Sequence, residues 1–154
     1  MDKKEIVLLR EATTNDLELI MAWRSNPLVY QGFYQQGTPL TWEEHISWWH
    51  SRNRDWRTFI IEYESRKVGV VTIGNLDSWA PELGWYIGEV SLWGKGIGKE
   101  AVGLGLDYIK SQNKKYARAT ILDDNERSIK LAKSLGFEKL GKARQGESWW
   151  QIKF

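Results

Sequence analysis

Apolar residues recur along this chain with two different periods, and the order of those periods predicts a mixed α/β (α+β) fold. Alternating or β-branched runs predict strands at residues 6–10, 57–64, 67–76, 82–88 and 116–123, and a terminal hairpin or pair of strands that ends with a strand at 149–154. Helical spacing predicts helices at residues 15–25, 42–53, 97–111 and 125–136. Ser65 and Arg66 suit a tight hairpin between two of the strands. We expect a central sheet of about six to seven strands with helices on both faces.

Polar residues mark where the first two helices begin. Thr14, or Thr13 beside it, can cap the first helix. Thr41 is followed three residues later by Glu44, which is the capping-box pattern, and this second helix should run to about Asn53. Residues 28–40 then form a polar, aromatic connection between the two helices.

Composition indicates one soluble domain that spans residues 1–154. The chain is 42% hydrophobic and 27% charged, and its net charge of +2 comes from intermixed acidic and basic residues. Such a distribution gives no electrostatic footprint for nucleic acid. The start of the chain lacks the apolar run of a signal peptide or membrane span, so we expect a cytoplasmic protein with no membrane partner. Cysteine is absent, which excludes disulfides, thiolate metal sites and a cysteine nucleophile.

The segment LWGKGIGKEA at residues 92–101 carries glycines at 94, 96 and 98 and runs into a predicted helix. Glycines leave backbone amides uncovered, and a helix N-terminus favours negative charge. Lys95 and Lys99 add positive charge, which favours a phosphate over a carboxylate. The loop is therefore a candidate anion site, although a simple turn with solvated lysines has the same composition.

Two phosphate-binding motifs fit this loop poorly. A P-loop needs Ser or Thr after Gly98-Lys99, and Glu100 stands there. A dinucleotide fingerprint needs G-x-G-x-x-G, whereas the glycines here follow G-x-G-x-G. Neither class is favoured.

Two longer segments, ELGWYIGEVSLWGKGIGKEAVGLGLDYI and ILDDNERSIKLAKSLGFEKLG, resemble the signature segments of the GNAT N-acetyltransferases. The form is similar to the ribosomal-protein and amino-sugar acetyltransferase branch, with its Trp-Gly-x-Gly loop, Asn-x-x-Ser helix and Leu-Gly-Phe ending. The resemblance covers nearly the whole chain and implies acetyl-CoA as cosubstrate. The residues that it implies for acetyl-CoA binding are Tyr86, Ile87, Gly88, Trp93, Gly94, Lys95, Gly96, Ile97, Gly98, Lys99 and Asn125.

Within this resemblance, the loop would hold the diphosphate, and the strand end at 86–88 would pair with the pantetheine arm. Two positions depart from the common family pattern. Trp93 replaces an Arg or Gln, as it does elsewhere in this branch, and Ala132 replaces the tyrosine that protonates the leaving thiolate. The thiolate's proton must then come from elsewhere, and a non-catalytic CoA-binding module stays open as an alternative.

Three residues are candidates for the proton transfers that acetylation of an amine requires. Glu82 shares a strand face with Gly84 and Tyr86, and Glu147 resembles the base of the ribosomal-protein branch. Ser128 matches the branch's serine and could protonate the thiolate, or it could bond its own helix. Water chains are an alternative base.

Acceptor contacts are expected from the segment between the first strand and the hairpin, where Arg24, His45 and Trp49 stand out. This region partly resembles the acetyltransferases of nucleotide-linked amino sugars, and a protein N-terminal amine is the rival acceptor. His45 and His50 are five residues apart, a spacing that predicts no metal site. The ten tryptophans mostly suit packing, and an exposed cluster of them would suit a dimer interface. We therefore expect a monomer or a homodimer.

Overall fold

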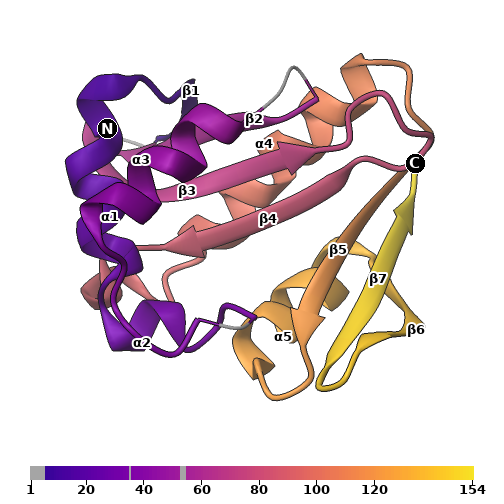
Figure 1. Ribbon diagram of the computed structural model, residues 1–154. Helices are drawn as coiled ribbons and strands as arrows, with labels where there is room; N and C mark the ends of the chain where they lie inside the picture. The colour runs from indigo at the N-terminus through magenta and orange to yellow at the C-terminus, as the bar shows by residue number, and fades with distance from the viewer. Residues whose placement is uncertain (1–5, 35, 53–54) are drawn as a thin grey trace.

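The computed structural model describes residues 6–34, 36–52 and 55–154, which build one seven-stranded sheet in the order β1-β2-β3-β4-β5-β7-β6 (Figure 1). Its strands are β1 (Val7–Glu11), β2 (Arg57–Tyr63), β3 (Arg66–Gly74), β4 (Glu82–Ile87), β5 (Tyr116–Leu122), β6 (Glu138–Arg144) and β7 (Glu147–Lys153). Neighbouring strands run antiparallel except for β4 and β5, which are parallel. The predicted fold class is confirmed.

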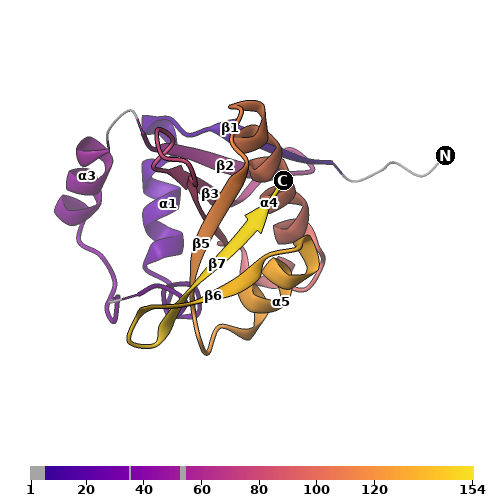
Figure 2. The same cartoon turned by 90° about the vertical axis from the view of Figure 1, so that its right-hand side faces the viewer.

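The helices are α1 (Leu17–Arg24), α2 (Pro27–Tyr30), α3 (Trp42–Ser51), α4 (Ile97–Ser111) and α5 (Glu126–Leu135), with single 3-10 turns at Thr14–Asp16 and Val90–Leu92. Helices α4 and α5 lie on one face of the sheet and α1 on the other, while α3 lies outside α1 (Figure 2). In the described part of the chain, no helix combines the length and the apolar character that crossing a bilayer requires.

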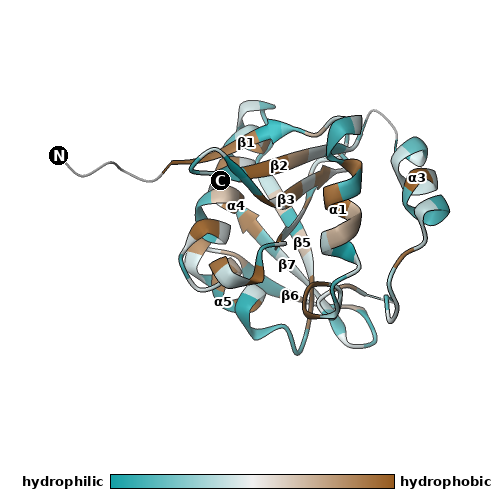
Figure 3. Ribbon diagram, turned by 90° about the vertical axis from the view of Figure 1, so that its left-hand side faces the viewer, coloured by the Kyte–Doolittle hydropathy of each residue, from teal (hydrophilic) through white to brown (hydrophobic). Residues whose placement is uncertain are grey.

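Strand alternation divides the core into two layers. On β3, Val71 and Ile73 pack toward α4 in the larger cluster, while Val70, just before them, packs toward Ile20 and Trp23 of α1. Successive side chains of a strand point to opposite faces, so one strand supplies both layers. The hydropathy colouring shows the same division, with apolar residues of α1 turned toward the strands (Figure 3).

Three local details differ from the sequence prediction. Residues 27–30 form the short helix α2 inside the expected connection, capped by the side chain of Asn26. The hairpin turn lies one residue earlier than predicted, because Glu64 and Ser65 adopt the left-handed conformation, with φ of +49° and +65°. Helix α3 ends at Ser51, and the predicted end, Asn53, lies outside the described residues.

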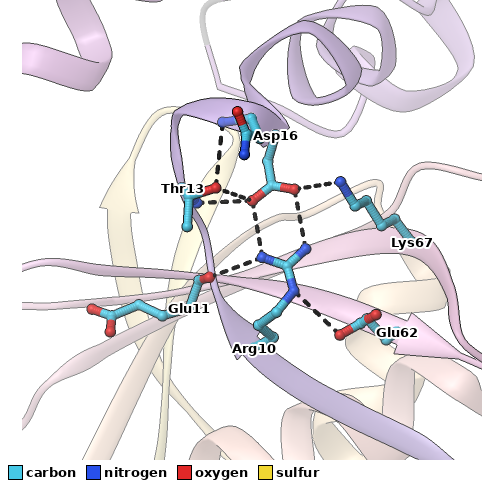
Figure 4. A network of polar contacts seen from close by, with 7 residues as sticks. Arg10, Glu11, Thr13, Asp16, Glu62 and Lys67 are labelled. Atoms are coloured by element: carbon cyan, nitrogen blue, oxygen red, sulfur yellow. Dashed lines mark hydrogen bonds and ion pairs between the residues drawn. The ribbon is translucent and has the colours of Figure 1, made fainter.

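A buried carboxylate ties the start of α1 to the sheet. Asp16 is only 1% exposed, receives two hydrogen bonds of 3.1 Å from the Arg10 guanidinium, and lies 2.8 Å from the Lys67 ammonium (Figure 4). It also accepts the Thr13 amide at 2.8 Å, which completes a capping box. Burial by itself raises the pKa of Asp16, but the bonds from Arg10, Lys67 and Thr13 outweigh it and hold that pKa well below its ordinary value.

We predict that Asp16→Asn lowers the free energy of unfolding by about 2–3 kcal/mol at pH 7, because two cations lose their shared counterion. A lowered pKa means that the carboxylate's contribution is complete above the unfolded-state pKa near 4 and declines as pH falls below it. Urea unfolding of both proteins between pH 7 and pH 3 should show the difference narrowing toward acid. Asp107→Asn, at an exposed position of α4, is the control. A difference that stays constant down to pH 3 would contradict this assignment.

Candidate active site

The site is built on the divergence of two parallel strands. β4 and β5 pair at one position, Glu82 opposite Arg118, and then separate (Figure 1). A cleft of about 930 Å³ fills the gap, lined by β4, β5, the glycine loop, the first turns of α4 and α5, and the residues that follow α2.

The edge of β4 that faces the cleft carries backbone groups that β3 does not use. The Gly88 amide donates to the Val68 carbonyl at 2.8 Å, which fixes the alternation of the ladder between β3 and β4. Tyr86 therefore turns its backbone toward β3, while Trp85 and Ile87 turn theirs toward the cleft. Of the strand end at 86–88, the Gly88 amide is thus already bonded within the sheet, and Ile87 is the residue whose backbone faces the cleft.

The glycine loop has the geometry of an anion cradle. Gly94 and Gly96 both have φ of +80°, and a Cβ added to either would meet no atom within 4 Å. Gly96 caps α4 without a side chain, so the first amides of that helix face the cleft uncovered. The loop thus offers free amides and open space at the N-terminus of a fifteen-residue helix.

Helix α5 supplies the opposite wall. The Asn125 side-chain oxygen accepts the Ser128 amide at 3.3 Å and caps the helix, which leaves the Asn125 amide nitrogen beside Gly32. The Ser128 hydroxyl lines the cleft and, among the described residues, makes no hydrogen bond, whereas Ser134 of the same helix bonds the carbonyl three residues before it. Ser128 therefore has a hydroxyl free to meet a ligand.

A stacked pair closes the outer end of the cleft, and the sequence did not reveal it. The Arg127 guanidinium lies 3.3 Å from the centre of the Trp93 ring, so α5 and the glycine loop touch across the gap. The Trp93 indole donates to the Ile87 carbonyl at 2.9 Å, on the free edge of β4. Burial lowers the pKa of Arg127. An Arg two residues after the Asn was the only signal for this contact.

Residues 30–34, which we call the crossing loop, bridge the two arms of the divergent sheet. Phe33 packs edge-on against Tyr86 of β4, with ring centres 5.1 Å apart. On the other arm, the Arg144 guanidinium of β6 stacks on Tyr34, 3.7 Å from the centre of its ring. The loop therefore spans the face opposite α4 from one arm to the other.

Glu82 lies on that face, at the point where the strands begin to separate. Its carboxylate accepts a 2.6 Å hydrogen bond from the Asn75 amide. Burial raises the pKa of Glu82, and the nearby Glu147 carboxylate raises it further, while the Asn75 bond and two nearby guanidiniums lower it. The net direction is upward, which suits a general base.

Glu147 has a different environment. It is 4% exposed, and its Oε1 accepts hydrogen bonds of 2.7 and 3.0 Å from Arg144. Neither Glu147 nor Glu82 lines the cleft itself. Because Glu147 is buried and ion-paired, its geometry is that of a residue that anchors the hairpin of β6 and β7.

None of the three residues predicted to contact the acceptor lines the cleft: Arg24 and His45 meet between α1 and α3, and Trp49 lies on α3. His45 is 0% exposed, its Nε2 donates to the Leu17 carbonyl at 2.7 Å, and its Nδ1 accepts from Arg24 at 3.3 Å. Burial lowers the pKa of His45, in the same direction as the nearby Arg24 charge. The Arg52 guanidinium stacks on the Trp49 ring, 3.4 Å from its centre. With both ring nitrogens used, His45 packs the helices instead of facing a ligand.

Most of the predicted cofactor and thiolate residues do meet in one place. Those that line the cleft are Tyr86, Ile87, Trp93, Gly94, Gly96, Ile97, Gly98, Lys99, Asn125 and Ser128. Gly88 and Lys95 are adjacent to it but do not line it.

Residues 7–138 match the family described as acetyltransferase (GNAT) domain. The chain belongs to the GNAT acetyltransferase family. The divergent strands, the glycine loop and the Asn-capped helix all lie within the matched residues.

Two of the matches come from Methanocaldococcus jannaschii. An uncharacterized protein is 51% identical over 149 residues, which are 95% of this chain but 31% of that protein. The chain thus spans about a third of the length of this relative. The crystal structure of a domain from the same organism is 47% identical, with a TM-score of 0.95 over 98% of this chain and all of that one.

A more distant structure shares the fold alone. It is the aminoglycoside acetyltransferase AAC(6')-Ib in complex with coenzyme A, which is 15% identical, with a TM-score of 0.86 over 96% of this chain and 95% of that one.

The left-handed φ of Gly96 yields a prediction about stability. Gly96→Ala should cost about 1 kcal/mol in the free energy of unfolding, because alanine is strained at φ of +80°. Gly103→Ala, at an open helical position of α4, should instead stabilise by up to about 1 kcal/mol. Thermal and urea unfolding of the pair would measure the contrast, and equal effects of the two substitutions would refute the left-handed assignment.

Proposed function

We propose that this domain transfers the acetyl group of acetyl-CoA to the primary amine of a small molecule by direct attack. The observation that carries the proposal is the cleft between β4 and β5, where a free strand edge and an uncovered helix N-terminus meet.

The residues of the cleft fit acetyl-CoA. The amides of the loop from Gly94 to Lys99 suit a diphosphate, because the open space at Gly94 and Gly96 admits phosphate oxygens. The edge at Trp85 and the Ile87 amide suit an extended arm that contains amides, which would add to β4 as a strand does. To reach the Ile87 carbonyl, such an arm would have to displace the Trp93 indole. When bound, acetyl-CoA supplies an acetyl thioester.

The chemistry requires two proton transfers, and the chain offers a group for each. The amine nitrogen forms a bond to the thioester carbonyl carbon as the carbon–sulfur bond breaks, so the amine loses a proton and the thiolate gains one. We assign the first proton to Glu82, directly or through water, because burial raises its pKa. The free hydroxyl of Ser128 supplies the second, in the place of the tyrosine that Ala132 replaces.

The crossing loop favours a small acceptor. It joins Tyr86 on one arm to Arg144 on the other, so it crosses the open end of the divergent strands, where a groove for a peptide would otherwise continue. Amino sugars, including nucleotide-linked ones, are the first acceptors to test. An N-terminal amine of a ribosomal protein, or binding of CoA without catalysis, is the alternative that turnover would decide.

Titration calorimetry with acetyl-CoA tests the cofactor placement. We expect binding by the native chain, no binding of NADH, and at least a hundredfold loss of acetyl-CoA affinity in Gly96→Glu, because a carboxylate would occupy the diphosphate's place. Gly146→Glu is the matched control, since it adds the same charge at φ of +77° with equally open space, in the turn between β6 and β7. Unchanged affinity in Gly96→Glu would reject the cradle.

The role of Glu82 has its own signature in the pH dependence of kcat. A base must be ionised, so kcat should fall as pH drops through the raised pKa of Glu82, at a higher pH than an ordinary glutamate would give. Glu82→Gln should remove this limb and lower kcat by about a hundredfold or more, with the acetyl-CoA Kd unchanged. Glu138→Gln, exposed on β6, is the control. A retained acidic limb in Glu82→Gln would assign the proton to another group.

A further inference from the structure

Arg118 lies beside Glu82 on the face of the sheet opposite α4. The two residues are register partners at the single pairing of β4 and β5. The Arg118 guanidinium lies 4.5 Å from the centre of the Trp79 ring and 5.8 Å from that of Trp149. Its Nε donates to the Gln151 side-chain oxygen at 2.8 Å. Contacts with both rings and this bond hold the side chain in a defined position.

Arg118 forms no ion pair within the described residues, a property that it shares with Arg24, Arg52 and Arg127 but not with Arg10 and Arg144. Arg10 pairs with Asp16, and Arg144 pairs with Glu147 at 2.7 Å. The Arg118 charge acts on the pKa of Glu82, yet no ion pair joins them, because the Glu82 carboxylate is held by Asn75. The two terminal nitrogens of Arg118 donate to no atom of the described chain, so they are free for a ligand.

A guanidinium that is fixed through Nε and through aromatic contacts, with both terminal nitrogens free, has the geometry for bidentate binding of an oxyanion. An amine positioned by Glu82 must lie over the start of β4, within a few ångströms of Arg118, since paired strands are about 5 Å apart. A second group of the same acceptor molecule would therefore meet Arg118.

We infer that the acceptor carries a phosphate or carboxylate in addition to its amine, and that Arg118 binds this oxyanion. The inference rests on the proposed function, and it narrows the acceptor from small amines to anionic ones. It separates this site from that of an aminoglycoside acetyltransferase, whose acceptors are polycations. Trp79, 60% exposed, and Trp149 would flank the acceptor with apolar ring faces.

Three matched amines provide the test: glucosamine, glucosamine 6-phosphate and muramic acid, which present no anion, a phosphate and a carboxylate. Calorimetric binding in the presence of CoA, and kcat/KM at saturating acetyl-CoA, would be compared for the native chain, Arg118→Gln and Arg118→Lys. Arg66→Gln, an exposed position at the start of β3, removes the same charge elsewhere.

We expect one of the anionic amines to exceed glucosamine by about tenfold or more in affinity and in kcat/KM, mainly through KM. The ratio of kcat/KM for the anionic amine to kcat/KM for glucosamine should fall toward one in Arg118→Gln and stay partly raised in Arg118→Lys. It should equal the native ratio in Arg66→Gln. The stronger of the two anionic probes identifies phosphate or carboxylate. Equal binding of all three amines, binding of none, or a ratio unaffected by Arg118→Gln would overturn the inference.

Failure of the proposed function looks different. It would appear as absent acetyl-CoA binding or absent turnover of every amine, while the preference for an anionic amine would still register in the binding titrations.

Discussion

The single pairing between β4 and β5 is the constraint on which the active site depends. Parallel strands usually pair along their length, but here Glu82 opposite Arg118 is the only partnership, and beyond it the strands separate. The separation leaves the edge of β4 without a neighbouring strand and brings the N-termini of α4 and α5 to the two sides of one gap. The same point places Glu82 and Arg118 side by side on the opposite face. Cofactor cleft and acceptor face thus share one geometric origin.

The sequence predicted elements well where one local signal dominates. Helix α4 begins and ends at the predicted residues, because a left-handed glycine starts it and its apolar spacing is regular. Helix α2 was not predicted, because it is only four residues long, although Asn26-Pro27 is a pattern that starts helices. The turn at Glu64 and Ser65 was misplaced by one residue because neither residue type favours a left-handed φ.

The site was predictable as a set of backbone positions and less so as a set of side chains. Glycine favours a left-handed backbone and asparagine favours a helix N-cap. The conformation of the glycine loop and the start of α5 could therefore be predicted from residue type and spacing. Whether a polar side chain is free depends on partners distant in sequence. From the sequence His45 could contact a ligand, but in the fold its two ring nitrogens are hydrogen-bonded to Leu17 and Arg24. The ion pair of Glu147 forms only because the hairpin brings Arg144 to it.

The contact of Trp93 with the Ile87 carbonyl has a consequence for the protein before any ligand arrives. An unpaired strand edge is a template on which a strand from another chain can add, and a cleft between diverging strands exposes such an edge inside a folded domain. The indole satisfies one carbonyl of that edge, and Arg127 stacked on the ring covers it from outside. The pair therefore disfavours the addition of a strand from another chain at this edge. A ligand must form a stronger interaction than the Trp93 indole does in order to bind the Ile87 carbonyl.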